Sequence, residues 1–286
     1  MRYEAPQSLD KAVALLAGAK GDARVLAGGT DLLVQLRSGT VEPDLVIDIK
    51  KIAEMRSVVA DKGGFRIGAA VTGAELKEHA ALKKAWPGVV EAANLIGSTQ
   101  IQGRATMGGN LCNGSPAADS VPALIAAGAT ATVIGPKGRR DLAVEDIMTG
   151  PRKLSLAKGE ILVSFNLPAR PKHAGDAYLR FIPRTEMDIA VVGIGINLTL
   201  DDKGTCTAAR VGLGAVAEKV LLVDTAAKAL VGTRIDDAAL KKLEAAVRAA
   251  CRPIDDKRGT KEFRIDVAGV LARRTAAIAL KRAKAG

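Results

Sequence analysis

The sequence predicts an α+β fold in three consecutive parts. Helix-like and strand-like segments alternate over residues 1–55, which is typical of a small parallel sheet with helices. From about residue 56 the pattern changes, and the proline-containing run 168–172 is the clearest linker before a region of strands followed by helices. The 286 residues are enough for several parts with a sizeable core, and we expect them at residues 1–55, 56–170 and 175–286.

In the first part, residue types at segment ends mark the elements. Ser8 or Asp10 can begin a helix that runs through Leu16, and Thr30 or Asp31 can cap a second helix. We expect strands at residues 25–26 and 45–48, and the second helix over residues 31–37.

Apolar runs mark the elements of the other two parts. In the second part we expect strands at residues 65–69, 130–134 and 161–167, and helices that begin near residues 72–75 and cover 89–96 and 121–127. In the third part we expect strands near 178–182, 190–200 and 207–213, then helices over about 236–251 and 260–283.

The first glycine motif, residues 27–33, reads Ala-Gly-Gly-Thr-Asp-Leu-Leu and lies between a predicted strand and a predicted helix. Glycine allows a positive φ and a close approach of backbone to ligand, and consecutive amide groups form an anion-binding nest. A strand, a glycine turn and a helix in this order can place a pyrophosphate on free amide groups. For this motif alone, a tight turn without a ligand is an equally good interpretation.

The second glycine motif, residues 105–111, reads Ala-Thr-Met-Gly-Gly-Asn-Leu and continues as a polar loop to residue 119. Asn110, Asn113 and Ser115 can donate or accept hydrogen bonds near a phosphate or a ribose. An ordinary surface loop is the alternative, although such a loop does not need this density of glycine, asparagine and proline. Two glycine motifs together predict a nucleotide cofactor held by both phosphates without a metal.

Composition excludes several other classes. The net charge is +11, yet the basic residues are scattered and aromatic residues make up only 2%, which disfavours nucleic-acid binding. Cys112, Cys206 and Cys251 contain no CxxC pair, so a disulfide framework, an iron–sulfur cluster and a zinc site are not expected. His79 and His173 are too few for a metal site. Neither a signal peptide nor an uncharged membrane span is evident, so a cytoplasmic location is expected.

The segment 212–217 fits the loose dinucleotide pattern G-x-G-x-x-A after a predicted strand. The next apolar run, residues 220–223, begins too soon for a crossover helix, and no acidic residue stands about twenty positions on. We therefore expect a turn between sheet strands rather than a second nucleotide site.

Taken together, the motifs resemble the FAD-binding, or medium, subunit of the molybdenum hydroxylase family, which includes carbon monoxide dehydrogenase and xanthine dehydrogenase. The resemblance covers nearly the whole chain and rests on residues 27–33, 101–111, 115–119, 159–162 with Leu167-Pro168, and 184–190. It implies a two-part FAD-binding domain, with a small parallel sheet and then a mainly antiparallel sheet, followed by a C-terminal antiparallel sheet plus helices. Gln102-Gly103 departs from the family's Arg-Asn.

The resemblance implies an oxidoreductase subunit with FAD as its cofactor. Electrons would pass from a small [2Fe-2S] subunit to FAD and then to an external acceptor, while a large molybdenum-cofactor subunit oxidises the substrate in a dimer of heterotrimers. Non-covalent FAD is expected because Thr30 stands where related covalent flavoproteins often have His. No catalytic residue or metal ligand is expected in this chain. The alternatives are a self-sufficient flavin oxidoreductase and an assembly module that has lost flavin.

By the same resemblance, residues 25–32 and 105–113 hold the pyrophosphate and ribityl chain. Asp119 would lie near the adenosine or ribose end, Ile96 near the flavin ring, and Leu162 against the flavin, while Arg180 matches a position that is basic in some relatives. The predicted cofactor-binding residues are Val25, Leu26, Ala27, Gly28, Gly29, Thr30, Asp31, Leu32, Ile96, Ala105, Thr106, Gly108, Gly109, Asn110, Leu111, Asn113, Asp119, Leu162 and Arg180.

Overall fold

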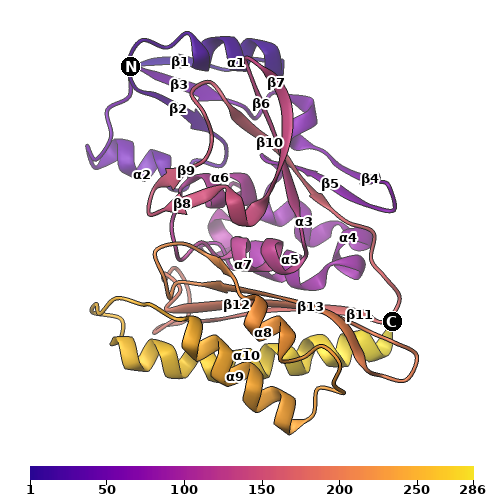
Figure 1. Ribbon diagram of the computed structural model, residues 1–286. Coiled ribbons are helices and arrows are strands. Elements are labelled where there is room, and N and C mark those ends of the chain that lie inside the picture. The colour runs from indigo at the N-terminus through magenta and orange to yellow at the C-terminus, as the bar shows by residue number, and fades with distance from the viewer.

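The computed structural model describes residues 1–286 and shows an α+β fold with three sheets stacked along one direction (Figure 1). The first sheet is parallel, with the strand order β1-β3-β2. Its elements are β1 (Arg2–Glu4), α1 (Leu9–Ala17), β2 (Ala23–Leu26), α2 (Leu32–Arg37) and β3 (Leu45–Asp48). Helix α1 begins after Ser8, whose hydroxyl accepts a hydrogen bond from the Lys11 amide, so Ser8 rather than Asp10 is the cap.

The second sheet is antiparallel, with the order β4-β5-β10-β6-β7. Its strands are β4 (Val58–Asp61), β5 (Gly64–Gly68), β6 (Thr130–Gly135), β7 (Gly138–Ala143) and β10 (Ile161–Leu167). The helices of this part are α3 (Gly73–Glu78), α4 (Ala80–Ala85), α5 (Pro87–Ala93), α6 (Met107–Cys112) and α7 (Ser120–Ala126), with 3-10 turns η1 (Ala53–Arg56), η2 (Thr99–Ile101) and η3 (Val144–Asp146). A small hairpin, β8 (Met148–Gly150) and β9 (Lys153–Leu154), precedes β10.

The third sheet is antiparallel, in the order β11-β12-β13-β14, and helices cover both of its faces (Figure 1). Its strands are β11 (Ala174–Phe181), β12 (Val192–Leu200), β13 (Cys206–Gly214) and β14 (Leu221–Leu222). Helices α5 and α7 of the second part contact one face, and α10 (Lys261–Ala285) contacts the other, with α8 (Asp224–Lys228) and α9 (Asp237–Ala250) beside it. None of the helices has the length and the apolar run that a membrane crossing requires.

Two apolar cores hold these parts together. The larger core joins Ala12 of α1, Ile47 of β3, Phe165 of β10 and Leu124 of α7, so the first two parts share one interior. The second core lies between the third sheet and α8–α10, where β12 and α10 contribute aliphatic side chains. Because the two cores are separate, the interface between α7 and the third sheet is a boundary between two packed units.

That interface explains two glycines of the third sheet, Gly195 in β12 and Gly212 in β13. A Cβ atom on Gly195 or Gly212 would lie 2.4 or 2.2 Å from the carbonyl oxygen of Pro122, in α7. Glycine is needed there so that α7 can approach the sheet closely. The prediction that residues 212–217 are no nucleotide turn agrees with this packing, with one difference: Gly212 and Gly214 lie within β13, and the turn to β14 follows them.

Candidate functional site

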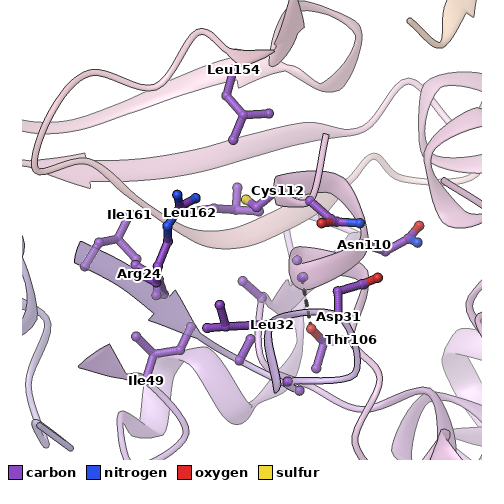
Figure 2. A pocket seen from close by; sticks show the side chains of 18 of the residues that line it. Arg24, Asp31, Leu32, Ile49, Thr106, Asn110, Cys112, Leu154, Ile161 and Leu162 are labelled. Carbon is purple, nitrogen blue, oxygen red and sulfur yellow. Dashed lines mark hydrogen bonds between the residues drawn. The ribbon is translucent and has the colours of Figure 1, made fainter. Parts of the chain in front are cut away.

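A cavity of ≈ 440 Å³ lies between the first two parts, where β2, α2, α6 and the start of β10 meet (Figure 2). Most of the predicted cofactor-binding residues line it, although they come from four separate segments of the chain. Those residues are Val25, Ala27, Gly28, Gly29, Thr30, Asp31, Leu32, Ile96, Thr106, Gly108, Gly109, Asn110, Asn113 and Leu162.

The first glycine motif presents a row of free amide groups to this cavity. Gly29 has a φ of 83°, in the left-handed region that favours glycine. The amide groups of residues 28–32 make no hydrogen bond within the chain, and α2 begins only at Leu32. Gly28 is buried because its neighbour is the second motif: a Cβ there would lie 2.0 Å from the carbonyl oxygen of Arg104. The two motifs are therefore in direct contact, and their free donors serve one site.

The second glycine motif is a helix start rather than a turn. Thr106 caps α6, and its hydroxyl accepts a hydrogen bond from the Gly109 amide at 3.0 Å, as Figure 2 shows. Neither Gly108 nor Gly109 has a positive φ, because the Thr106 N-cap places both in the first turn of the helix. The amide of Gly108, which lines the cavity, makes no hydrogen bond within the chain and adds a donor to those of the first motif.

The two glycines of α6 differ in what surrounds them. A Cβ on Gly108 would lie 2.4 Å from the carbonyl oxygen of Ala69, so this position is closed by the protein itself. A Cβ on Gly109 would contact only the Thr106 hydroxyl, at 3.1 Å. Because Gly109 lines the cavity, its missing side chain leaves space that a ligand can use.

Polar side chains from both motifs complete this end of the cavity. The Gln35 amide donates to Asn113 Oδ1 at 3.3 Å and so links α2 to the end of α6. Asn110 Oδ1 accepts from the amide and the hydroxyl of Ser120, which leaves the NH₂ group of Asn110 for a ligand. Asp31 has no hydrogen-bonding partner for its carboxylate, and partial desolvation by the surrounding protein raises its pKa. These groups can form hydrogen bonds with the hydroxyl or phosphate groups of a ligand.

The rest of the cavity has apolar walls. Leu154 of the β8–β9 hairpin points toward the cavity from the side opposite Leu32 and Ile49, and Ile161 and Leu162 come from β10 (Figure 2). Such walls suit a planar aromatic ring system, whereas the free amides suit phosphates. Together, the residues present fit a dinucleotide with an aromatic ring, as FAD is.

Five predicted residues do not line the cavity. Leu26, Ala105 and Leu111 are buried in the protein interior. Asp119 and Arg180 form an ion pair of 2.9 Å, with the Tyr178 hydroxyl 3.4 Å from Asp119. Burial raises the pKa of Asp119 to about 6, although Arg180 opposes this shift. The pair joins α7 to β11, and a role of these five residues in cofactor binding stays a prediction.

Several lining residues were missed by reasoning from the sequence. Arg24 directly precedes the strand predicted at residues 25–26 and lies in β2, but nothing in the sequence shows that its side chain faces a cavity. Arg152 and Leu154 come from the β8–β9 hairpin, which has no motif or periodicity. Cys112 falls within the predicted range 105–113 but is not among the individually predicted binding residues; it lines the cavity, and burial raises the pKa of its thiol to about 12. Glu160 is engaged by Arg140, 2.7 Å away.

The structure shows no group of three or more His, Cys, Asp or Glu residues that could hold a metal ion. Arg184 and Asp188, in the segment 184–190 that carries part of the family resemblance, form an ion pair of 3.0 Å whose arginine is exposed. The site thus consists of hydrogen-bond donors for an anionic cofactor and apolar walls for its ring.

Comparisons with known proteins agree with this geometry. Residues 1–170 match the family model described as the FAD binding domain in molybdopterin dehydrogenase, and residues 177–279 match the CO dehydrogenase flavoprotein C-terminal domain. The putative xanthine dehydrogenase FAD-binding subunit XdhB of Escherichia coli K12 is 34% identical over 92% of this chain and 90% of its own length.

The carbon monoxide dehydrogenase medium chain of Afipia carboxidovorans is also 34% identical, over 99% of this chain and 97% of its own length. A solved structure of CO dehydrogenase from Oligotropha carboxidovorans superposes with a TM-score of 0.94, covering 99% of this chain and 98% of that one at 34% identity. The likeness therefore extends over both packed units and not only over the glycine motifs.

Proposed function

We propose that this chain, which belongs to the FAD-binding subunits of the molybdenum hydroxylase family, transfers electrons between partner subunits and an external acceptor. It is an FAD-binding oxidoreductase subunit, as its relatives are. The finer proposal is that electrons arrive from iron–sulfur clusters of a partner subunit and leave from the flavin.

The observation that carries this proposal is the chemistry of the cavity lining. Its four charged side chains are Arg24, Asp31, Arg152 and Glu160, and two of them are already held in ion pairs with Asp22 and Arg140. Cys112 is protonated at neutral pH because its pKa is raised to about 12. The lining therefore offers binding groups and no pair of groups suited to acid–base work on an organic substrate.

Each part of the lining has a proposed role toward FAD. The free amides of residues 28–32 and of Gly108 would bind the diphosphate, and Asn110 and Asn113 would bind hydroxyl or phosphate oxygens. The apolar walls would enclose the aromatic part and exclude water. When bound, FAD supplies the redox chemistry, and the protein supplies its position and surroundings.

The names of the relatives support a proposal about the partner subunits. These relatives are described as medium chains, FAD-binding subunits or subunits of dehydrogenase complexes. We propose that this chain likewise assembles with a small [2Fe-2S] subunit and a large molybdenum-cofactor subunit, as a dimer of heterotrimers. Its net charge of +11 would favour association with an acidic partner surface. The relatives act on different compounds, so no substrate is assigned.

Rapid mixing with the substrate of the complex tests the proposal. The assembled complex should show reduction of its flavin and of its iron–sulfur clusters, whereas the isolated FAD-loaded chain should stay oxidised. Dithionite, which needs no partner subunit, should bleach both flavins and so serves as the control. Substrate-dependent bleaching in the isolated chain would indicate a self-sufficient flavoenzyme, and a chain unable to bind FAD would indicate an assembly module.

A further inference from the structure

The tip of the β8–β9 hairpin carries a residue type that its backbone disfavours. Gly150 pairs with Lys153, so Pro151 and Arg152 form a two-residue turn. Arg152 has a φ of 57°, in the left-handed region where glycine or asparagine is preferred. A non-glycine residue in this conformation costs stability, which is a reason to look for a function of its side chain.

Backbone contacts, rather than the side chain of Arg152, hold this tip in place. The Arg152 amide donates a hydrogen bond to the carbonyl oxygen of Gly114 at 2.8 Å. Gly114 has a φ of 66°, and a Cβ on it would lie 2.8 Å from the Cα atom of Arg152. The tip is thus packed directly on the loop that follows α6. Because the backbone makes this contact, the hairpin does not need the guanidinium.

Arg152 is one of the residues that line the cavity, and its exposed side chain has no ion pair or hydrogen bond within the chain. The other cation of the lining, Arg24, is 2.9 Å from Asp22. Of the two acidic side chains, Glu160 is paired with Arg140 and Asp31 is unpaired. Arg152 is therefore the cation in this cavity whose charge is left for a ligand.

We propose that Arg152 binds the diphosphate of FAD. The free amides of the two glycine motifs are neutral donors, whereas the FAD diphosphate carries two negative charges. A guanidinium adds a full positive charge and parallel N–H donors that match phosphate oxygens. This proposal rests on FAD binding in the cavity and is independent of the electron-transfer role.

Replacing Arg152 by Gly removes the positive charge and also relieves the disfavoured φ. The variant should therefore lose FAD affinity without losing stability. Titration of the FAD-free chain with FAD should show an affinity lower by roughly 10- to 100-fold, as expected for one lost charge-assisted hydrogen-bonded contact. The thermal unfolding temperature of the FAD-free variant should be unchanged or higher than that of the wild type. Arg152→Lys should recover part of the affinity.

Lys62 provides a matched control. It has a φ of 49° in the turn between β4 and β5, is exposed, and does not line the cavity. Lys62→Gly removes the same charge and relieves the same backbone conformation, and it should leave FAD affinity unchanged. Equal FAD affinity of Arg152→Gly and wild type would overturn the proposal, and so would an equal loss in both variants, which would mean that net charge alone attracts FAD. A wild-type chain that binds no FAD would instead contradict the cofactor assignment.

Discussion

Replacing Gly109 by Ala should weaken cofactor binding and leave the stability of the fold nearly unchanged, whereas the same change at Gly108 should destabilise the fold. Both glycines lie in the first turn of α6 and line the cavity. A Cβ on Gly109 would contact only the Thr106 hydroxyl, at 3.1 Å, and would otherwise enter open space. A Cβ on Gly108 would lie 2.4 Å from the carbonyl oxygen of Ala69, which is backbone and cannot turn aside.

The expected free energies of unfolding follow from these surroundings. Gly109→Ala gains up to about 1 kcal/mol of helix propensity, and the close Thr106 contact offsets part of this gain. Gly108→Ala overpacks a closed position at a cost of about 1–3 kcal/mol. For a unit of this size, each kcal/mol changes the unfolding temperature by roughly 2–4 °C, so Gly108→Ala should lower it by about 2–12 °C.

Thermal unfolding of the FAD-free chain, followed by circular dichroism, measures the change in stability, and titration with FAD measures the change in cofactor affinity. The methyl group of Gly109→Ala stands where a phosphate would approach the free amides, so FAD affinity should fall at least about tenfold through loss of a charge-assisted hydrogen bond. If Gly109→Ala binds FAD as tightly as the wild type, the second motif does not contact the cofactor as proposed. If it unfolds as early as Gly108→Ala, the distinction between the two positions is wrong.

Three further outcomes are expected. Acid precipitation of the FAD-loaded chain should leave flavin in the supernatant, because the cavity's cysteine, Cys112, has a pKa near 12 and is no nucleophile at neutral pH; flavin in the pellet would show a covalent bond. Burial raises the pKa of Asp119 from 3.8 to about 6 against the opposing effect of Arg180, so the folded chain binds more protons than the unfolded chain between these pH values. The unfolding free energy of the wild type, relative to Asp119→Asn, should therefore fall as pH rises through this window, and a constant difference would refute the shift. Gly212→Ala places a Cβ 2.2 Å from the carbonyl oxygen of Pro122 and should lower thermal stability at unchanged FAD affinity, whereas a selective loss of affinity would point to a nucleotide site there.

Elements that carry their own signals could be predicted from the sequence. β10 and β12 are long apolar runs, and both lie where the sequence places strands. α9 and α10 have helical spacing and begin after the side-chain caps Asp236 and Thr260. Short elements such as β8, β9 and β14 were missed, because two or three residues are too few to show a period and depend on their partners for stability.

The same distinction, between residues that carry their own sequence signal and residues that do not, applies to the candidate site. The glycine motifs could be recognised because their residues lie together in the sequence. The opposite wall could not, because Arg152 and Leu154 reach the cavity only when the β8–β9 hairpin folds over α6, through contacts such as the one between Arg152 and Gly114. The helical geometry of Gly108 and Gly109 was missed for another reason: glycine lowers helix propensity, and the cap at Thr106 outweighs it.

Glycine pairs in this chain have three different physical causes, and only one of them concerns a ligand directly. Gly29 supplies a positive φ. Gly28, Gly108 and Gly212 supply room for neighbouring backbone, since each missing Cβ would lie within 2.4 Å of a carbonyl oxygen of the chain. At Gly109 the missing Cβ would face the cavity, with the capping hydroxyl as its only neighbour. In this chain, the glycine feature that fits a ligand is a missing Cβ that would face the cavity, and the pattern G-x-G-x-x-A at residues 212–217 does not have it at Gly212, where the backbone of Pro122 fills the space.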